Sequence, residues 1–298
     1  MLNYKDIQNR IEALDDIQGV DLSIIGYSLL NKPIYAIHLG NYDGPQMIME
    51  GGIHAREYLS TLFLIEEIKY LATKDIINGG IYVVPMVNPD GIELVLNGTT
   101  NLPCDILRRY LLDVNNNNPD FSQWKANANA VDLNVNFDAS WGEGTQNVFC
   151  PSSGNFVGYY PESEREVNNL IRFTKEVNPS ITISWHTKGE VIYYGFKSLS
   201  PEDLMRDYNI ALSLSAVNGY QIIKTEGSVG GYSDYISLVY NVPAYTIEIG
   251  NGALPHPIGE EYLMEVFEQN KNVPIVALEN VGGKFFDESI SSVCKIIK

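Results

Sequence analysis

The sequence predicts a single α/β domain in which helices cover both faces of a mostly parallel or mixed β-sheet. Short apolar and β-branched runs alternate along the chain with segments of helical periodicity, which is the pattern of strands joined by crossover helices. Of the 298 residues, 45% are apolar and 19% charged, which suits a folded protein with one large core. We therefore expect residues 1–298 to form one domain.

The first part of the chain is predicted to hold a helix, a hairpin and a strand-helix-strand unit. Residues 98–160 are rich in Asn, Gly, Ser and Asp and only weakly periodic, so we expect long ordered loops over the sheet there. Functional residues often lie in such loops. The elements expected before this segment are a helix at 5–15, a hairpin at 24–39, a strand at 47–50, a helix at 57–71 and a strand at 81–87.

The rest of the chain is predicted to alternate again between strands and helices. Ligands of α/β proteins bind at the carboxyl ends of strands, so residues that follow a strand are the first candidates for a site. The expected helices lie near 162–176, 201–217 and 259–279, and the expected strands at 181–185, 191–194 and 244–249.

Charge and cysteine usage exclude several classes of function. The chain has 37 acidic and 20 basic residues and a net charge of −17, which disfavours nucleic acid and anionic membranes as partners. No apolar run reaches membrane-spanning length, and the N-terminal residues lack the apolar segment of a signal peptide. The widely spaced Cys104, Cys150 and Cys294 suggest neither a disulfide framework nor a thiolate metal site. We expect a cytoplasmic location.

A histidine and a glutamate stand three residues apart where a predicted strand meets a predicted helix. In the segment 51–57 (GGIHARE), the side chains of His54 and Glu57 fall on one side of the turn and can share a metal ion. The best third ligand is His186, at the end of the strand 181–185, and His38 and His256 are poorer candidates. Taken singly, each of these residues could instead be hydrogen-bonded without a metal.

Two histidines and one glutamate form a standard ligand set of catalytic zinc sites, which keep one position open. The metal lowers the pKa of water and polarises a carbonyl, but a separate carboxylate has to take and return the proton. Glu248 interrupts the otherwise apolar strand 244–249, where burial of an unpaired carboxylate would cost several kcal/mol. We expect Glu248 to face the site as general base; the alternative is a paired glutamate at a sheet edge.

A series of motifs in one order resembles the zinc carboxypeptidase family. Agreement at so many ordered places, over roughly residues 20–280, is far more specific than any single motif. The motifs are IGYS at 25–28, KPIY at 32–35, GIHARE at 52–57, PMVNPDG at 85–91, WKAN at 124–127, VDLN at 131–134, SWHT at 184–187 and TIE at 246–248.

The resemblance implies a mixed, mainly parallel sheet of about eight strands and one zinc ion per chain. It places His54, Glu57 and His186 on the zinc ligands of the family. Glu248 falls on the family's general base, and Arg56 on an arginine that binds substrate beside the metal.

The sequence departs from the family at two substrate-binding arginines and a mobile tyrosine. Val135 follows Asn134 where the family has the arginine that clasps a terminal carboxylate. Asn129 stands in the place that we expect for the arginine that polarises the scissile carbonyl, and residues 226–228 occupy the stretch of the tyrosine. Because a bidentate Arg–carboxylate contact supplies both geometry and charge, ordinary removal of C-terminal residues is disfavoured.

These departures and the segment 186–194 resemble the bacterial γ-D-glutamyl-L-diamino acid endopeptidases, a branch of the family. The resemblance implies hydrolysis of the γ-D-glutamyl–meso-diaminopimelate bond of peptidoglycan stem peptides, by a protein that in some members acts in the cytoplasm of sporulating cells. We expect Arg56, Lys188, Asn129 and Asn134 to contact this substrate. The alternatives are a zinc metallocarboxypeptidase with a relocated clamp, which Arg56 or Lys188 would provide, and a protein that binds cell-wall fragments without catalysis.

Overall fold

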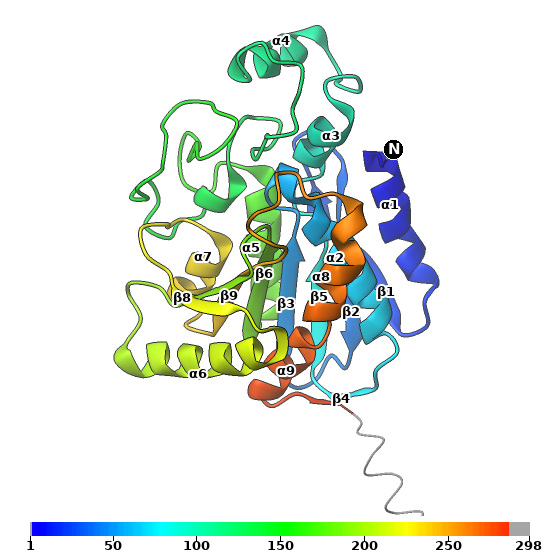
Figure 1. The fold of residues 1–298 in the computed structure, drawn as a ribbon, viewed down its shortest axis with the longest axis vertical. Helices are drawn as coiled ribbons and strands as arrows, with labels where there is room; N and C mark the ends of the chain where they lie inside the picture. Colours follow the sequence, from blue (N-terminus) through cyan, green and yellow to red (C-terminus); the bar gives the residue numbers. More distant parts are fainter. Residues whose placement is uncertain (1, 286–298) are drawn as a thin grey trace, which may run out of the picture.

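An eight-stranded sheet runs through the centre of the computed structural model, which describes residues 2–285. Its strand order is β1-β2-β5-β3-β6-β9-β7-β8, with β5, β3, β6 and β9 mutually parallel (Figure 1). The strands are β1 Val20–Tyr27, β2 Pro33–Gly40, β3 Gln46–Gly51, β5 Gly80–Val84, β6 Ile181–His186, β7 Val191–Tyr194, β8 Gln221–Lys224 and β9 Ala244–Glu248.

The edges of the sheet make it mixed. β1 and β2 form the predicted antiparallel hairpin, β2 is antiparallel to β5, and β7 is antiparallel to β9. This confirms the mixed, mainly parallel sheet of eight strands in one α/β domain. A second, small sheet pairs β4 (Ile76–Asn78) with β10 (Lys284–Phe285). Cys294 and the predicted end of the domain lie outside the described residues.

Helices cover both faces of the large sheet, as predicted. Within residues 2–285, no helix combines the length and the apolar character needed to cross a membrane. One face carries α1 Tyr4–Glu12, α2 Tyr58–Leu71, α6 Pro201–Asn218, α8 Leu263–Asn270 and α9 Val273–Asn280, and the other carries α5 Arg165–Val177 and α7 Tyr232–Val239. Helices α3 (Pro89–Asn97) and α4 (Asp105–Val114) stand beyond one end of the sheet, beside long loops (Figure 1).

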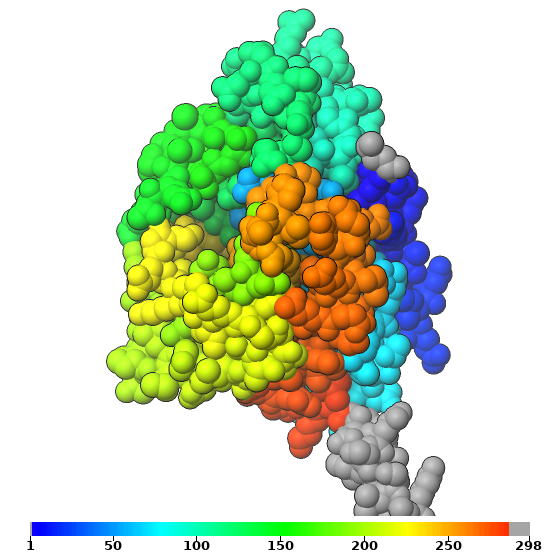
Figure 2. Space-filling view, in the orientation of Figure 1, coloured from blue at the N-terminus to red at the C-terminus, as the bar shows by residue number. Residues whose placement is uncertain are grey.

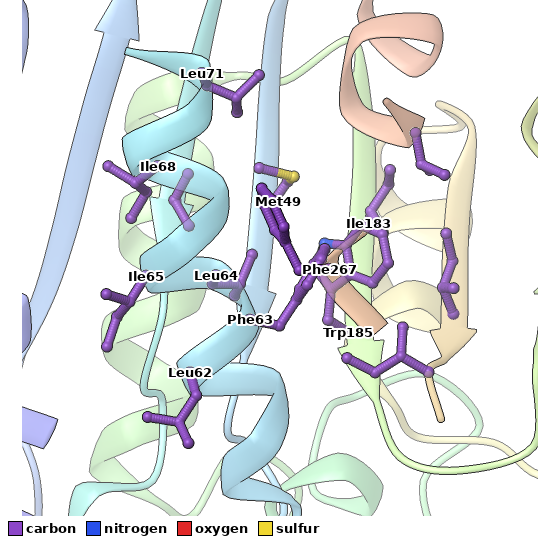
Figure 3. Close-up of a cluster of buried hydrophobic side chains, with 14 of the residues drawn as sticks. Met49, Leu62, Phe63, Leu64, Ile65, Ile68, Leu71, Ile183, Trp185 and Phe267 are labelled. Atoms are coloured by element: carbon purple, nitrogen blue, oxygen red, sulfur yellow. The ribbon is translucent and has the colours of Figure 1, made fainter. Parts of the chain in front are cut away.

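Strand residues alternate between two hydrophobic clusters, one on each face of the sheet. Met47 and Met49 of β3 point into the cluster under α2, whereas Ile48 points into the cluster under α5 and α7. Figure 3 shows the first cluster, in which Phe63 of α2 packs against Trp185 of β6 with the ring centroids 4.6 Å apart. Every residue of β3 and β6 is buried, so both faces of these two strands lie against other parts of the protein.

Several elements differ from the prediction. The single helix expected at 259–279 is wrong: α8 ends at Asn270 and α9 begins at Val273. Pro274 lies in the first turn of α9, where its missing N–H is tolerated, whereas it could not continue the preceding helix. The region expected to be loops contains α4, and the prediction also lacked α3, β8 and α7, which are short elements set by tertiary packing.

Candidate metal centre and its cavity

His54 and Glu57 are presented by the tight connection between β3 and α2. Gly52 has φ +62°, and a Cβ there would come within 2.4 Å of the Thr61 hydroxyl, so only glycine allows the chain to turn this close to α2. A short 3-10 helix, η2 (Ala55–Glu57), follows at once. It brings His54 Nδ1 to 3.0 Å from Oε1 of Glu57, and both side chains are buried.

His186 is the last residue of β6, the strand that pairs with β3. Its Nδ1 lies 3.0 Å from Oε2 of Glu57 and 3.2 Å from Nδ1 of His54. His38 lies elsewhere, on β2, with its ring stacked on Tyr42 at a centroid distance of 4.1 Å. The structure therefore brings together the three predicted ligands from two neighbouring strand ends.

The three side chains fit a metal ion. One potential ligand atom from each of His54, Glu57 and His186 lies within 4.8 Å of the others, and all three residues are buried. The two imidazole nitrogens face each other and the carboxylate, so a proton or a cation has to lie between these groups. Burial alone would lower the pKa of His186, but its hydrogen bond to Glu57 raises that pKa to about 9. Two histidines and a carboxylate suit zinc.

A buried carboxylate orients His54 from behind. Oδ1 of Asp132 lies 3.3 Å from Nε2 of His54, which leaves Nδ1 of the same ring for the metal. The other oxygen of Asp132 lies 3.1 Å from Nζ of Lys125 and accepts a hydrogen bond from the Asn155 N–H at 2.9 Å. Lys125 and His54 are thus connected through one carboxylate that is 0% exposed.

Glu248 ends β9 beside the metal ligands. In the parallel pairing of β6 and β9 it stands directly opposite His186, and it lines a cavity of about 380 Å³. Its Oε2 is buried and has no hydrogen-bond partner among the described residues. Burial, followed by repulsion from Glu57, raises the pKa of Glu248 to about 7. A carboxylate with such a pKa, close to a metal ion, is suited to accept and return a proton near neutral pH.

Two cavities meet at the metal ligands. The larger, of about 380 Å³, and the smaller, of about 210 Å³, share His54, Lys125 and Asn134 in their walls. The wall of the smaller cavity includes a contact between two loops, in which the Thr145 N–H donates to the carbonyl of Gly227 at 3.0 Å. In Figure 2 the green loop region lies at the upper left of the visible face, and an orange segment lies across the centre of that face.

The four predicted substrate-binding residues are not equally placed. Asn134 lines both cavities. Asn129 lines neither, because its side-chain amide lies 3.3 Å from each carboxylate oxygen of Glu164. The ammonium of Lys188 donates to the backbone carbonyls of Gly252, at 2.8 Å, and Leu254, and Lys188 lines neither cavity. Arg56 adjoins the ligand Glu57 but also lies outside both cavity walls.

Lys125 is the residue that the sequence reasoning missed. Among residues 2–285, no arginine lines either cavity, and Lys125 is the one lysine that does. The carbonyl of Lys125 accepts a hydrogen bond from the Ala55 N–H at 3.0 Å, which fixes this loop against η2. The WKAN motif contains Lys125, whereas the resemblance to the family points to Asn129, four residues further along, as the place of a cation.

The fold and this ligand cluster are those of an α/β protein with a buried candidate metal centre, and comparison with known proteins specifies the family. The family model described as zinc carboxypeptidase matches residues 12–272. The chain therefore belongs to the zinc carboxypeptidase family, and its buried ligand cluster suits the one zinc ion of that family.

Individual proteins that resemble the chain agree with its assignment to this family. The γ-D-glutamyl-L-diamino acid endopeptidase 1 of Lysinibacillus sphaericus is 33% identical over 270 residues, which are 86% of this chain and 66% of that protein. The chain thus spans slightly less than two thirds of that relative. Bovine thrombin-activatable fibrinolysis inhibitor has the same fold, with a TM-score of 0.70, 22% identity and coverage of 94% and 95% of the two chains. The murein-tripeptide amidase of Escherichia coli O157 aligns with a TM-score of 0.55, 20% identity and coverage of 87% and 91%.

Proposed function

We propose that the protein is an endopeptidase that hydrolyses the γ-D-glutamyl–diamino acid bond of peptidoglycan stem peptides. One observation carries this proposal: among the described residues no arginine lines either cavity at the metal ligands, and the one lysine that does, Lys125, cannot make a bidentate contact with a carboxylate. The clasp on a terminal carboxylate depends on the bidentate geometry of an arginine. The name of the Lysinibacillus relative supports the same substrate class.

The proposed roles follow from the positions of the side chains. His54, Glu57 and His186 hold zinc, which supplies Lewis acidity and lowers the pKa of water when it is bound. Glu248 takes the proton from the attacking water and returns it to the nitrogen of the leaving diamino acid. Asp132 keeps the ring of His54 in the orientation that presents Nδ1.

Lys125 takes the role that we predicted for Lys188 or Arg56. A γ-linked D-glutamate keeps a free α-carboxylate near the scissile bond, and this charge needs a cation at the metal site. Lys125 lines both cavities next to His54, whereas the ammonium of Lys188 is bound to loop carbonyls. A charge-assisted contact of this kind contributes about 1.5–3 kcal/mol. Asn134 offers a neutral amide in the same wall.

The test uses the tetrapeptide L-Ala-γ-D-Glu-meso-diaminopimelyl-D-Ala, because the two peptidase types cut it at different bonds. We expect release of the dipeptide diaminopimelyl-D-Ala, identified by mass. Release of free D-Ala would refute the endopeptidase and support the metallocarboxypeptidase. A zinc-loaded protein that binds the peptide and cleaves no bond would instead be the binding protein. A cytoplasmic location and a role in sporulation stay predictions made from the sequence.

A further inference from the structure

The smaller cavity is a passage from the metal centre to the surface. Its inner end is formed by buried residues, among them His54 and Val135, which is 9% exposed. Its outer end is formed by exposed residues of two loops, Thr145 and Gln146 on one side and residues 226–228 on the other. A passage with an exposed outer end can hold a chain that continues out of the protein, whereas a closed pocket cannot.

Val135 gives this passage its room and its direction. It is the last residue of a short 3-10 helix, η3 (Leu133–Val135), and it lines the smaller cavity but not the larger one. By resemblance, its position is that of the family's arginine that clasps the terminal carboxylate of the leaving residue. A valine is shorter than an arginine and uncharged. The passage therefore begins where the main chain of the leaving residue reaches the wall, on the amine side of the scissile bond.

The wall of the passage is rich in neutral amide groups. Four side-chain amides line it, those of Asn134, Gln146, Asn147 and Asn155. Oδ1 of Asn134 accepts the Tyr232 N–H at 3.1 Å, which leaves the N–H groups of this amide as donors. Nδ2 of Asn147 is buried and has no acceptor among the residues that the structure describes. Such donors suit the carbonyl oxygens of a peptide.

A second carboxylate finds no cation in this passage. Among the described residues no arginine lines it, its one lysine, Lys125, is the proposed partner of the D-glutamyl α-carboxylate, and its one acidic side chain, Glu226, repels anions. Burial of a carboxylate without a cation is unfavourable, whereas an amide in the same place is satisfied by neutral donors. The passage therefore favours an amide over a terminal carboxylate.

We propose that the passage binds the main chain that continues beyond the leaving diamino acid, through an amide at the carboxyl group that carries D-alanine in a stem tetrapeptide. This inference rests on the proposed function and narrows its substrate class. Stem peptides that end at the diamino acid are poor substrates, and those with at least one further residue are good ones. The reaction that supplies the substrate therefore leaves the residue after the diamino acid in place.

The experiment compares three peptides with the zinc-loaded protein. They are L-Ala-γ-D-Glu-meso-diaminopimelate as the free acid, the same tripeptide with an amide at the carboxyl group that carries D-Ala in the tetrapeptide, and the tetrapeptide. We expect kcat/KM for the tetrapeptide and for the amide to exceed that for the acid by about tenfold to a hundredfold. Equal values for the acid and either of the other two would refute this inference alone. Hydrolysis of none of the γ-D-glutamyl bonds would refute the proposed function and this inference with it.

Two substitutions of Val135 separate charge from bulk. Val135→Arg places a cation at the inner end of the passage, so it should raise kcat/KM for the tripeptide acid, lower that for the tetrapeptide and invert the preference. Val135→Met is the matched neutral control, which adds bulk without charge and should lower kcat/KM for the tetrapeptide without raising that for the acid. An unchanged preference in folded, zinc-loaded Val135→Arg would overturn the assignment.

Asn147→Leu tests the wall itself and does not depend on the folding of the Val135 variants. Leucine has a similar size but no N–H donor, so kcat/KM for the tetrapeptide should fall about twofold to tenfold. The tripeptide acid, which has no further residue in the passage, should be unaffected. Ser237→Ala, in the wall of the larger cavity alone, is the control and should leave the ratio of the two peptides unaltered. An equal loss with both peptides in Asn147→Leu would contradict the binding of an extended chain in this passage.

Discussion

Replacing Asp132 by Asn should weaken zinc binding although Asp132 is not a ligand. The carboxylate accepts from two groups at each oxygen: His54 Nε2 at 3.3 Å and the Asn134 N–H at 3.1 Å on Oδ1, Lys125 Nζ at 3.1 Å and the Asn155 N–H at 2.9 Å on Oδ2. An amide nitrogen in either place would face two donors. The neutral amide removes the counter-charge of Lys125 in either orientation, and with its nitrogen toward Nε2 of His54 the ring of His54 would also lose its fixed orientation.

The size of the effect follows from this geometry. Loss of a partner that orients a metal-binding histidine costs about 10- to 100-fold in metal affinity. That range corresponds to about 1.4–2.7 kcal/mol. Because Asp132 is 0% exposed, the variant should also lower the free energy of unfolding of the metal-free protein, by about 3 kcal/mol.

A chelator competition measures the zinc dissociation constant, and urea unfolding of the metal-free protein measures stability. The matched control is Asp90→Asn on α3. Asp90 is also buried, lies 2.7 Å from Nζ of Lys32 and accepts the Leu30 N–H at 2.9 Å, but it does not contact His54. Asp90→Asn should destabilise the fold and leave zinc affinity unchanged. The reasoning would be refuted by a wild-type zinc affinity in Asp132→Asn, or by an equal loss of affinity in both variants.

Three further predictions concern metal, base and pH. Removal of zinc by a chelator should abolish hydrolysis and preserve most of the circular dichroism spectrum, because the core does not include the metal; activity in demonstrably zinc-free protein would contradict this. Glu248→Gln should retain zinc and lower kcat by about two orders of magnitude or more, and near-normal turnover would assign the base elsewhere. Burial raises the pKa of Glu166 from 4.5 to about 7 in the folded protein. The stability that the protonated carboxyl contributes is therefore complete at pH 4 and is lost as the pH rises through about 7. The resulting loss of unfolding free energy by pH 8, on the order of 3 kcal/mol, should be absent in Glu166→Gln, and identical pH profiles would contradict the burial argument.

The metal ligands could be predicted because their positions depend on regular structure. His186 ends β6, which is buried on both faces, and His54 and Glu57 follow β3, which is buried in the same way. Both groups therefore had to meet at the carboxyl edge of the sheet. Glu248 was found for a related reason, since a carboxylate in an apolar strand needs a special environment. The strand order was available only through resemblance to the family, because sequence periodicity does not specify which strands pair.

The substrate-binding side chains could not be predicted in the same way, because they lie on irregular backbone. Lys188 is two residues from the ligand His186, yet its ammonium points to the loop of Gly252. Asn129 and Lys125 are four residues apart in a loop in which Ala130 has φ +58°, and only Lys125 reaches the cavity. The helix α7, which lines part of the larger cavity, has only eight residues, and tertiary contacts rather than a long periodic pattern determine it.

The direct pairing of His186 with Glu248 on adjacent strands has an evolutionary consequence. His186 and Glu248 are inherited as part of the sheet, in which β6 is constrained by burial on both faces. The larger cavity, by contrast, is lined in part by α7, where Ser233 and Ser237 can be substituted without changing the ligands. Proteins that share this sheet can therefore change their substrate preference through substitutions in one short helix. That helix is the first segment to randomise when the specificity of such a peptidase is to be altered.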